Sequence, residues 1–111
     1  MQYNNQYNIG NYYNINQYNP YSNKLVVLTM GDFNKKEFGL IKSFIFEAIS
    51  KYENYFDISN DIEDNINKTF EGRWEVVVGE KDKFNVKGHY ESDKYLGVNI
   101  GQYKIAINRI D

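Results

Sequence analysis

Apolar residues recur along this sequence with two different spacings, and the spacing changes where glycine or polar residues interrupt it. Residues 25–30 form a short apolar run rich in β-branched side chains, which predicts a strand that ends at Gly31. From Phe38 to Tyr52 the apolar residues instead recur every three or four positions, the spacing of one buried helix face. Asn34 and Glu37 match a capping box, so we expect the first helix over residues 34–52.

A second helix is predicted from a start signal at Asn60 and Asp61, because acidic residues in a first turn suit the positive end of a helix dipole. Gly72 is a natural C-terminal stop for this helix. The apolar residues between these signals recur at four-residue steps: Ile62, Ile66 and Phe70.

Beyond Gly72 the apolar spacing becomes two, which is typical of strands. We predict strands over residues 74–79, 84–91, 95–100 and 103–108, with a two-residue hairpin turn at Gly101 and Gln102. The element order β-α-α-β-β-β-β predicts an α+β fold in which two helices pack on an antiparallel sheet. The strand over residues 84–91 is the most polar and has the character of a sheet edge, which either templates another chain or is blunted by Lys87 and used for nothing.

Residues 1–23 differ from the rest of the chain. They contain eight Asn, six Tyr and three Gln and no charged side chain, a low-complexity composition that predicts a disordered tail before a domain over residues 24–111. Three interpretations of this tail stay open: a sticky or regulatory arm, a strand laid along the edge of the domain's own sheet, or neutral sequence drift.

Composition narrows the class of protein. Tyr and Phe together supply 18 residues, so we expect aromatic rings to carry much of the core. The net charge of −2, with both signs interspersed, gives no field that would gather nucleic acid or anionic lipid. There is no cysteine, no apolar run long enough to span a bilayer and no secretory signal, so we expect an intracellular protein.

Catalytic chemistry lacks its usual residues. His89 is the only histidine, and a solvated strand histidine is a simpler interpretation than a metal ligand. The acidic residues Asp61, Glu63 and Asp64 fit a helix first turn better than a catalytic pair. The glycines form no phosphate-binding loop. We therefore expect no enzymatic activity, no cofactor and no metal.

Several segments, in order, resemble the cytoplasmic dynein light chain type 1 family. Residues 74–79, with the sequence Trp-Glu-Val-Val-Val-Gly, resemble its Trp-His-x-Ile/Val-Val/Ile-Gly strand. Residues 95–102 followed by Ile105 and Ala106 resemble its aromatic strand, Leu-Gly-Gln turn and last strand. Residues 27–33 and 47–52, then Asp61, Ile62, Ile66 and Phe70, fall where the family has its first strand and its two helices.

The resemblance implies a dimer in which one strand of each subunit crosses to the partner's sheet and forms a groove that takes an extended peptide. The groove strand implied here is Phe84, Asn85, Val86, Lys87, Gly88 and His89. The helix start that would cap the bound peptide is Ser59, Asn60 and Asp61. The pocket floor would be Tyr95, Gly97, Asn99 and Lys104, and the dimer interface would involve Glu75, His89 and Tyr90.

Three departures from the family change these expectations. Glu75 replaces a histidine near the dimer axis, where two carboxylates would repel each other. Gly97 and Asn99 replace two pocket tyrosines, and Ser59-Asn60 replaces an acidic-basic pair, so we expect altered peptide specificity.

The resemblance predicts a non-catalytic light chain of a dynein motor complex, cytoplasmic or axonemal and associated with the cytoskeleton. Its expected partners are a dynein intermediate or heavy chain and cargo peptides, with a homodimer or a heterodimer both open and with neither nucleic acid nor membrane. The alternative is a non-motor structural or regulatory interaction protein in which the tail drives self-association.

Overall fold

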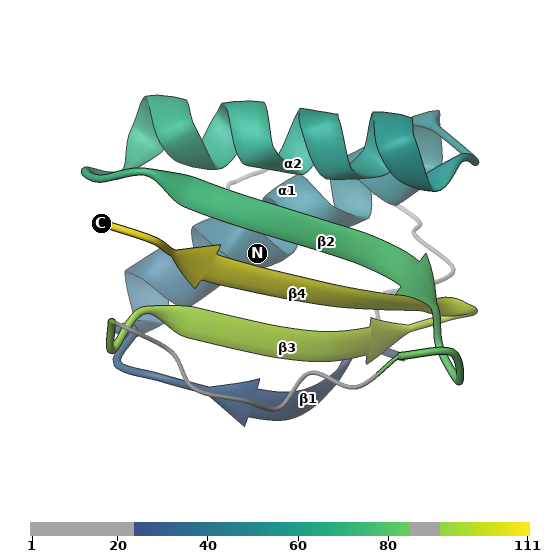
Figure 1. Cartoon of the computed structure of the whole chain (residues 1–111), viewed down its shortest axis with the longest axis horizontal. Helices are drawn as coiled ribbons and strands as arrows, with labels where there is room; N and C mark the ends of the chain where they lie inside the picture. Colours follow the sequence, from purple (N-terminus) through teal and green to yellow (C-terminus); the bar gives the residue numbers. More distant parts are fainter. Residues whose placement is uncertain (1–23, 85–91) are drawn as a thin grey trace.

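The computed structural model describes residues 24–84 and 92–111, and these residues form two helices and a four-stranded antiparallel sheet (Figure 1). The elements in chain order are β1 (Val26–Met30), α1 (Lys35–Lys51), α2 (Tyr55–Thr69), β2 (Trp74–Glu80), β3 (Tyr95–Ile100) and β4 (Tyr103–Arg109). The predicted α+β class is confirmed. Of the predicted strand over residues 84–91, Phe84 is described and lies outside any strand, and residues 85–91 lie outside the described residues.

The sheet has the strand order β1-β3-β4-β2, so β1 and β2 are its edges. In Figure 1, α1 crosses behind the sheet and α2 runs along the outer side of β2. Contacts join α2 both to the edge strand β2 and to α1. The helix α1 therefore covers one face of the sheet, and α2 packs beside α1 and along the edge formed by β2. None of the helices in residues 24–84 and 92–111 is both long and apolar enough to cross a membrane.

The start of α1 is the predicted capping box. The Asn34 side chain accepts from the Glu37 N–H at 2.8 Å, and the Glu37 carboxylate accepts from the Asn34 N–H at 2.9 Å. Two of the donors that a helix start leaves unpaired are thereby satisfied. The apolar stripe then faces the sheet through four buried residues: Ile41, Ile45, Ala48 and Ile49.

The predicted start of the second helix is wrong. The helix begins at Tyr55 with Asn54 as its N-cap, because the Asn54 side chain accepts from the Asp57 N–H at 2.8 Å. Asn60 and Asp61 therefore lie within α2 rather than at its first turn. Ile58 adds one more step to the buried series of Ile62 and Ile66, and this apolar face carries the helix back to residue 55.

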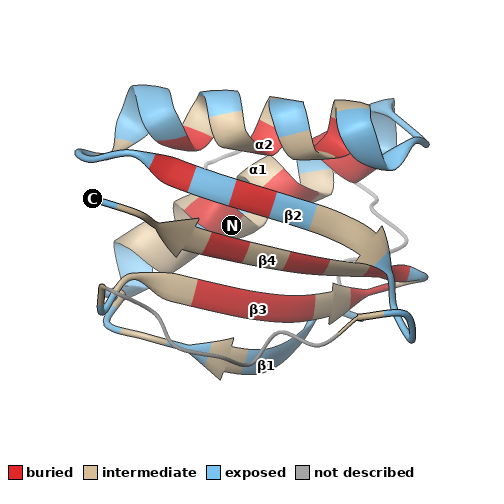
Figure 2. Ribbon diagram, viewed as in Figure 1, coloured by how far each residue is buried: buried red, intermediate tan, exposed pale blue. Residues whose placement is uncertain are grey.

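The core is built from branched aliphatic side chains, and the expected aromatic core is wrong. Among the described residues, Trp74 and Tyr103 are the only aromatic members of the buried cluster, which is mostly Ile and Val. Several phenylalanines pack against the outside of this cluster: Phe33, Phe38, Phe44, Phe46 and Phe70. Aromatic rings therefore pack at the margins of the core, and its interior is mostly β-branched side chains. Figure 2 shows that the buried residues of β2, β3 and β4 alternate with more exposed ones or lie on the middle strands.

The hairpin between β3 and β4 follows the sequence prediction. Gly101 has a φ of 58°, a conformation that is strained for most other residues, at the first central position of the turn. The turn fixes the register in which Ile100 lies opposite Tyr103, and all seven residues of β2 then pair with β4.

Candidate functional site

The face of the sheet that is turned away from the helices is the candidate functional site, and we call it the outer face. Along β3 and β4 the residues Leu96, Val98, Ile105 and Ile107 are buried under the helices, so the alternate residues point the other way. The outer face consists of Glu75 and Val77 on β2, Tyr95, Gly97 and Asn99 on β3, and Lys104, Ala106 and Asn108 on β4.

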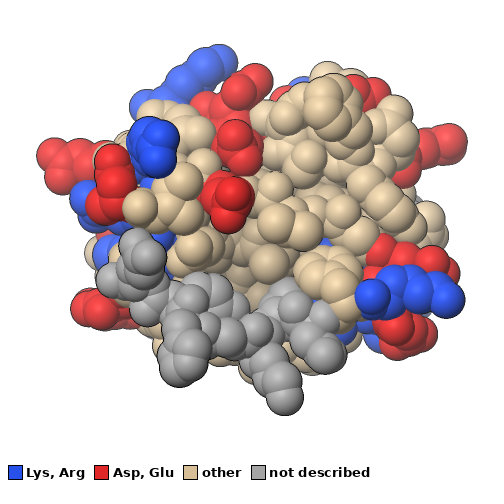
Figure 3. All heavy atoms as spheres, viewed as in Figure 1, with Lys and Arg blue, Asp and Glu red and all other residues tan. Residues whose placement is uncertain are grey.

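The pairing register arranges the outer face in cross-strand rows. Glu75, Asn108 and Tyr95 form one row. Val77, Ala106 and Gly97 form the middle row, where small side chains leave a flat, uncharged surface. Figure 3 views the molecule from this side: uncharged atoms make up much of the surface that is not grey, most charged side chains lie toward its two ends, and acidic side chains also lie near the middle.

Two amide oxygens on the outer face lack a hydrogen-bond donor within the described part of the chain. They are the Oδ1 atoms of Asn99 and Asn108, and both are shielded from solvent. An unsatisfied buried polar atom costs about 1–3 kcal/mol. The described residues therefore leave two acceptors on the outer face without a donor.

Phe84 is anchored at one end of the outer face. The Lys104 ammonium donates to the Phe84 carbonyl oxygen at 2.7 Å and lies 5.6 Å from the centre of its ring. The ring also occupies the space above Gly79, where an added Cβ would lie 2.8 Å from a ring carbon. The first residue of the predicted groove strand is thus fixed against β2 and β4.

Side chains of α2 occupy two N–H groups on the free edge of β2. The Val76 N–H donates to Glu63 Oε1 at 3.1 Å, and the Trp74 N–H donates to Asn67 Oδ1 at the same distance. Both acceptors come from α2, and both donors lie on the strand side that does not pair with β4. These side chains satisfy groups that an added strand would otherwise bind.

The structure separates the residues that the resemblance grouped together. Ser59, Asn60 and Asp61 lie within α2, so the expected capping of a peptide by a helix start at these residues is wrong. Asp61 instead forms an ion pair with Lys51 on α1, with 3.8 Å between Oδ1 and Nζ. The exposed helix start belongs to Asn54, five positions before Ser59.

The other predicted residues have mixed outcomes. Tyr95 and Glu75 lie in one row of the outer face, on either side of Asn108. The remaining predicted residues lie outside the described residues: Asn85, Val86, Lys87, Gly88, His89 and Tyr90. The sequence predicted that Asn108 alternates with Ile107 in the last strand, but Asn108 was not among the predicted site residues.

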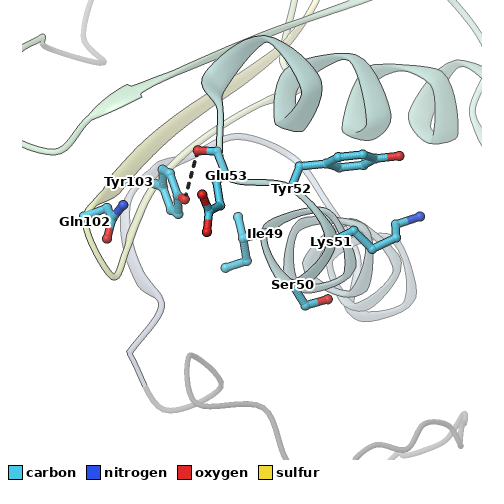
Figure 4. A pocket seen from close by; sticks show the side chains of 7 residues that line it. All are labelled: Ile49, Ser50, Lys51, Tyr52, Glu53, Gln102 and Tyr103. Carbon is cyan, nitrogen blue, oxygen red and sulfur yellow. Dashed lines mark hydrogen bonds between the residues drawn. The ribbon is translucent and has the colours of Figure 1, made fainter.

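A separate open recess lies between the end of α1 and the β3–β4 turn (Figure 4). The Tyr103 hydroxyl donates to the Glu53 carbonyl oxygen at 3.4 Å across it, and the Lys51 and Tyr52 side chains point away from Tyr103. Within residues 24–84 and 92–111, no group of three or more His, Cys, Asp or Glu residues is placed to hold a metal ion.

The fold has counterparts among solved structures. The DLC-like domain of CsTAL3 matches with a TM-score of 0.63 and 10% sequence identity, over 77% of this chain and 90% of that one. The dynein light chain-like domain of the Fasciola hepatica calcium binding protein FhCaBP2 matches with a TM-score of 0.61 and 14% identity, over 81% of this chain and 95% of that one. Neither a protein-family model nor a curated protein sequence matches the chain. At these identities the likeness concerns the fold, and the chain has the fold of a dynein light chain-like domain.

Proposed function

We propose that this chain is a non-catalytic interaction subunit of the cytoplasmic dynein light chain type 1 family, which takes a segment of a partner chain as an added β-strand along residues 84–89. The proposed partners are a dynein intermediate or heavy chain and cargo proteins. The proposed location is the cytoplasm or the axoneme, in association with the cytoskeleton.

The observation that carries this proposal is the outer face with its two unsatisfied amide oxygens. The middle of this face is flat and uncharged, and Asn99 and Asn108 flank it with Oδ1 atoms that find no donor among the described residues. A partner segment added beside residues 84–89 would pair its backbone with that segment. Where it crosses the outer face, its donors would reach the two Oδ1 atoms. The anchoring of Phe84 on Lys104 supports the same mode, because it holds the start of the proposed pairing strand beside this face.

The free edge of β2 is a poor place for the partner to pair, because α2 side chains already bind two of its N–H groups. An incoming segment that paired with β2 would displace the Glu63 and Asn67 side chains from the Val76 and Trp74 N–H groups. Pairing along residues 84–89, as proposed, does not use those two N–H groups. The proposal therefore places the partner next to that segment and over the outer face.

The test is a binding assay with overlapping 12-residue peptides that tile dynein intermediate- and heavy-chain sequences. We expect at least one peptide to bind the full chain with a Kd in the micromolar range, as is common for single peptide motifs, on the order of −8 kcal/mol. Substitution Asn99→Leu should weaken that peptide about tenfold, because it removes an acceptor at the site. The matched control Ser43→Leu, on the exposed side of α1, should bind like the wild type.

Two results would overturn the proposal. The first is the absence of binding by every tiled peptide. The second is equal binding by the wild type and Asn99→Leu, which would place the peptide away from the outer face.

A further inference from the structure

The two edges of the sheet differ in how they are protected. Side chains of α2 occupy N–H groups on the free edge of β2, whereas β1 pairs with β3 on one side and has no such cover from the described helices. Four apolar side chains of β1 are 40–55% exposed: Val26, Val27, Leu28 and Met30. Figure 2 shows the contrast between this strand and the buried β3 beside it.

The exposure of β1 extends to both of its faces. Val27 lies opposite Val98 on the helix side of the sheet, and Val26 lies opposite Asn99 on the outer face. Leu28 is an extra residue in a bulge between Val27 and Thr29. Edge strands are usually protected by charged residues or proline, and residues 25–30 contain neither. An unprotected apolar edge of this kind tends to pair with another strand.

We propose that residues 12–18 of this same chain add as an antiparallel strand to the free edge of β1. These residues lie outside the described residues. The segment of residues 1–23 runs directly into β1, so an antiparallel return needs only a turn. Asn19-Pro20 is a dipeptide that favours such a turn.

The composition of residues 12–18 fits the apolar edge that it would meet. The stretch Tyr-Tyr-Asn-Ile-Asn-Gln-Tyr contains no charge, no glycine and no proline. Tyr13 and Ile15 alternate with Asn14 and Asn16, so one side of the strand can pack on apolar β1 side chains while the other presents amides. Seven extended residues span about 23 Å, which is sufficient to cover the five residues of β1.

Covalent attachment makes this occupant more favourable than a free segment of the same composition. A strand joined to its site through a short connection has an effective concentration in the millimolar range, so weak pairing suffices to keep the edge covered. A separate chain would have to reach that concentration in solution. The tail would thereby protect an aggregation-prone edge, and it would leave residues 84–89 free for a partner.

The test uses the full chain and NMR spectroscopy. We expect cross-strand Hα–Hα contacts between residues 12–18 and residues 26–30, and slow hydrogen exchange at the β1 amides that do not bond to β3. Substitution Ile15→Pro should abolish these contacts and accelerate exchange at those amides about tenfold, because proline removes a ladder donor. The matched control Ile9→Pro, outside the proposed strand, should leave both readouts unchanged.

Mixed samples of labelled and unlabelled chains then identify which molecule supplies the strand. Contacts within one molecule support the proposal. Contacts that appear only between molecules would overturn it in favour of a second copy of the chain. Fast exchange at the free β1 amides in the wild type, unchanged by Ile15→Pro, would overturn it in favour of an uncovered edge.

Discussion

The Glu63 carboxylate on α2 accepts a hydrogen bond from the backbone N–H of Val76 on β2, with 3.1 Å between Oε1 and N. The bond attaches the second helix to the edge of the sheet and takes up a donor that another strand could use. Its loss should therefore affect both stability and the availability of that edge.

Substitution Glu63→Ala should lower the free energy of unfolding by about 1–2 kcal/mol, because the Val76 N–H loses its partly buried acceptor. Glu63→Gln keeps an acceptor oxygen and should cost less. The measurement is urea denaturation of both variants, with Asp64→Ala on the exposed side of α2 as the matched control. A Glu63→Ala variant as stable as Asp64→Ala would contradict the role assigned to this bond.

The pKa of Glu37 makes stability depend on pH. The Asn34 N–H, and then the Lys94 ammonium at 3.3 Å, hold the pKa of this carboxyl below its ordinary value of 4.5, although burial opposes them. A lowered folded-state pKa contributes stability above the unfolded pKa, and this stability is lost as the pH falls through the folded pKa. Glu37→Gln should therefore flatten the decline in stability below about pH 4.5.

Two measurements check this pH dependence. Carbon-detected NMR titration of the Glu37 carboxyl should give a midpoint below 4.5. Urea denaturation across the acidic range should show a steeper decline for the exposed-site control Glu47→Gln than for Glu37→Gln. Parallel declines in the two variants would contradict the assignment.

Two glycines predict opposite effects of the same substitution. Gly39 lies in α1 with open space where an added Cβ would lie, so Gly39→Ala should raise the free energy of unfolding by about 0.5–1 kcal/mol. Gly72 has a φ of 95° and its Cβ would collide with the Arg109 side chain, so Gly72→Ala should lower it by about 1 kcal/mol or more. Denaturation midpoints of the two variants check the signs, and equal shifts would show that local conformation does not govern these sites.

Glu75 should oppose any dimer formed through the outer face. Its side chain is exposed on β2, and a second copy packed on this face about a two-fold axis would bring a second carboxylate near it. In sedimentation equilibrium of the full chain at neutral pH, Glu75→Gln should tighten self-association about fivefold relative to the wild type. Glu80→Gln, at the far end of the same strand, should not. If Glu75→Gln left the association constant unchanged, the outer face would not be a self-association surface.

Sequence patterns predicted most of the elements because the apolar spacing and the turn chemistry agreed. The capping box at Asn34, the strand over residues 95–100 and the hairpin at Gly101 are all in the structure as predicted. The start of α2 was misplaced because two polar start signals lie six residues apart. The pair Asn54 and Asp57 was the signal that the fold uses, and Ile58 in register with Ile62 would have favoured it.

Contacts between distant residues could not be predicted from local patterns. Lys94 donates to the Asp32 carbonyl oxygen and to Glu37, and its ammonium lies 5.2 Å from the centre of the Phe33 ring. It thereby joins the start of β3 to the start of α1. The closure of the β2 edge by Glu63 and Asn67 has the same origin, because in the sequence both residues look like ordinary polar positions of a helix. The packing of distant elements, and not the local sequence, places Lys94, Glu63 and Asn67 beside their partners.

The central claim is that a partner segment pairs as a strand along residues 84–89 and over the outer face. The most direct measurement is an isotope-filtered NMR spectrum of the labelled full chain with an unlabelled bound peptide from the tiled set. We predict backbone contacts between the peptide and residues 84–89, together with side-chain contacts to Asn99 and Ala106. Peptide contacts confined to α1 or α2, with none to residues 84–89 or to the outer face, would contradict the account.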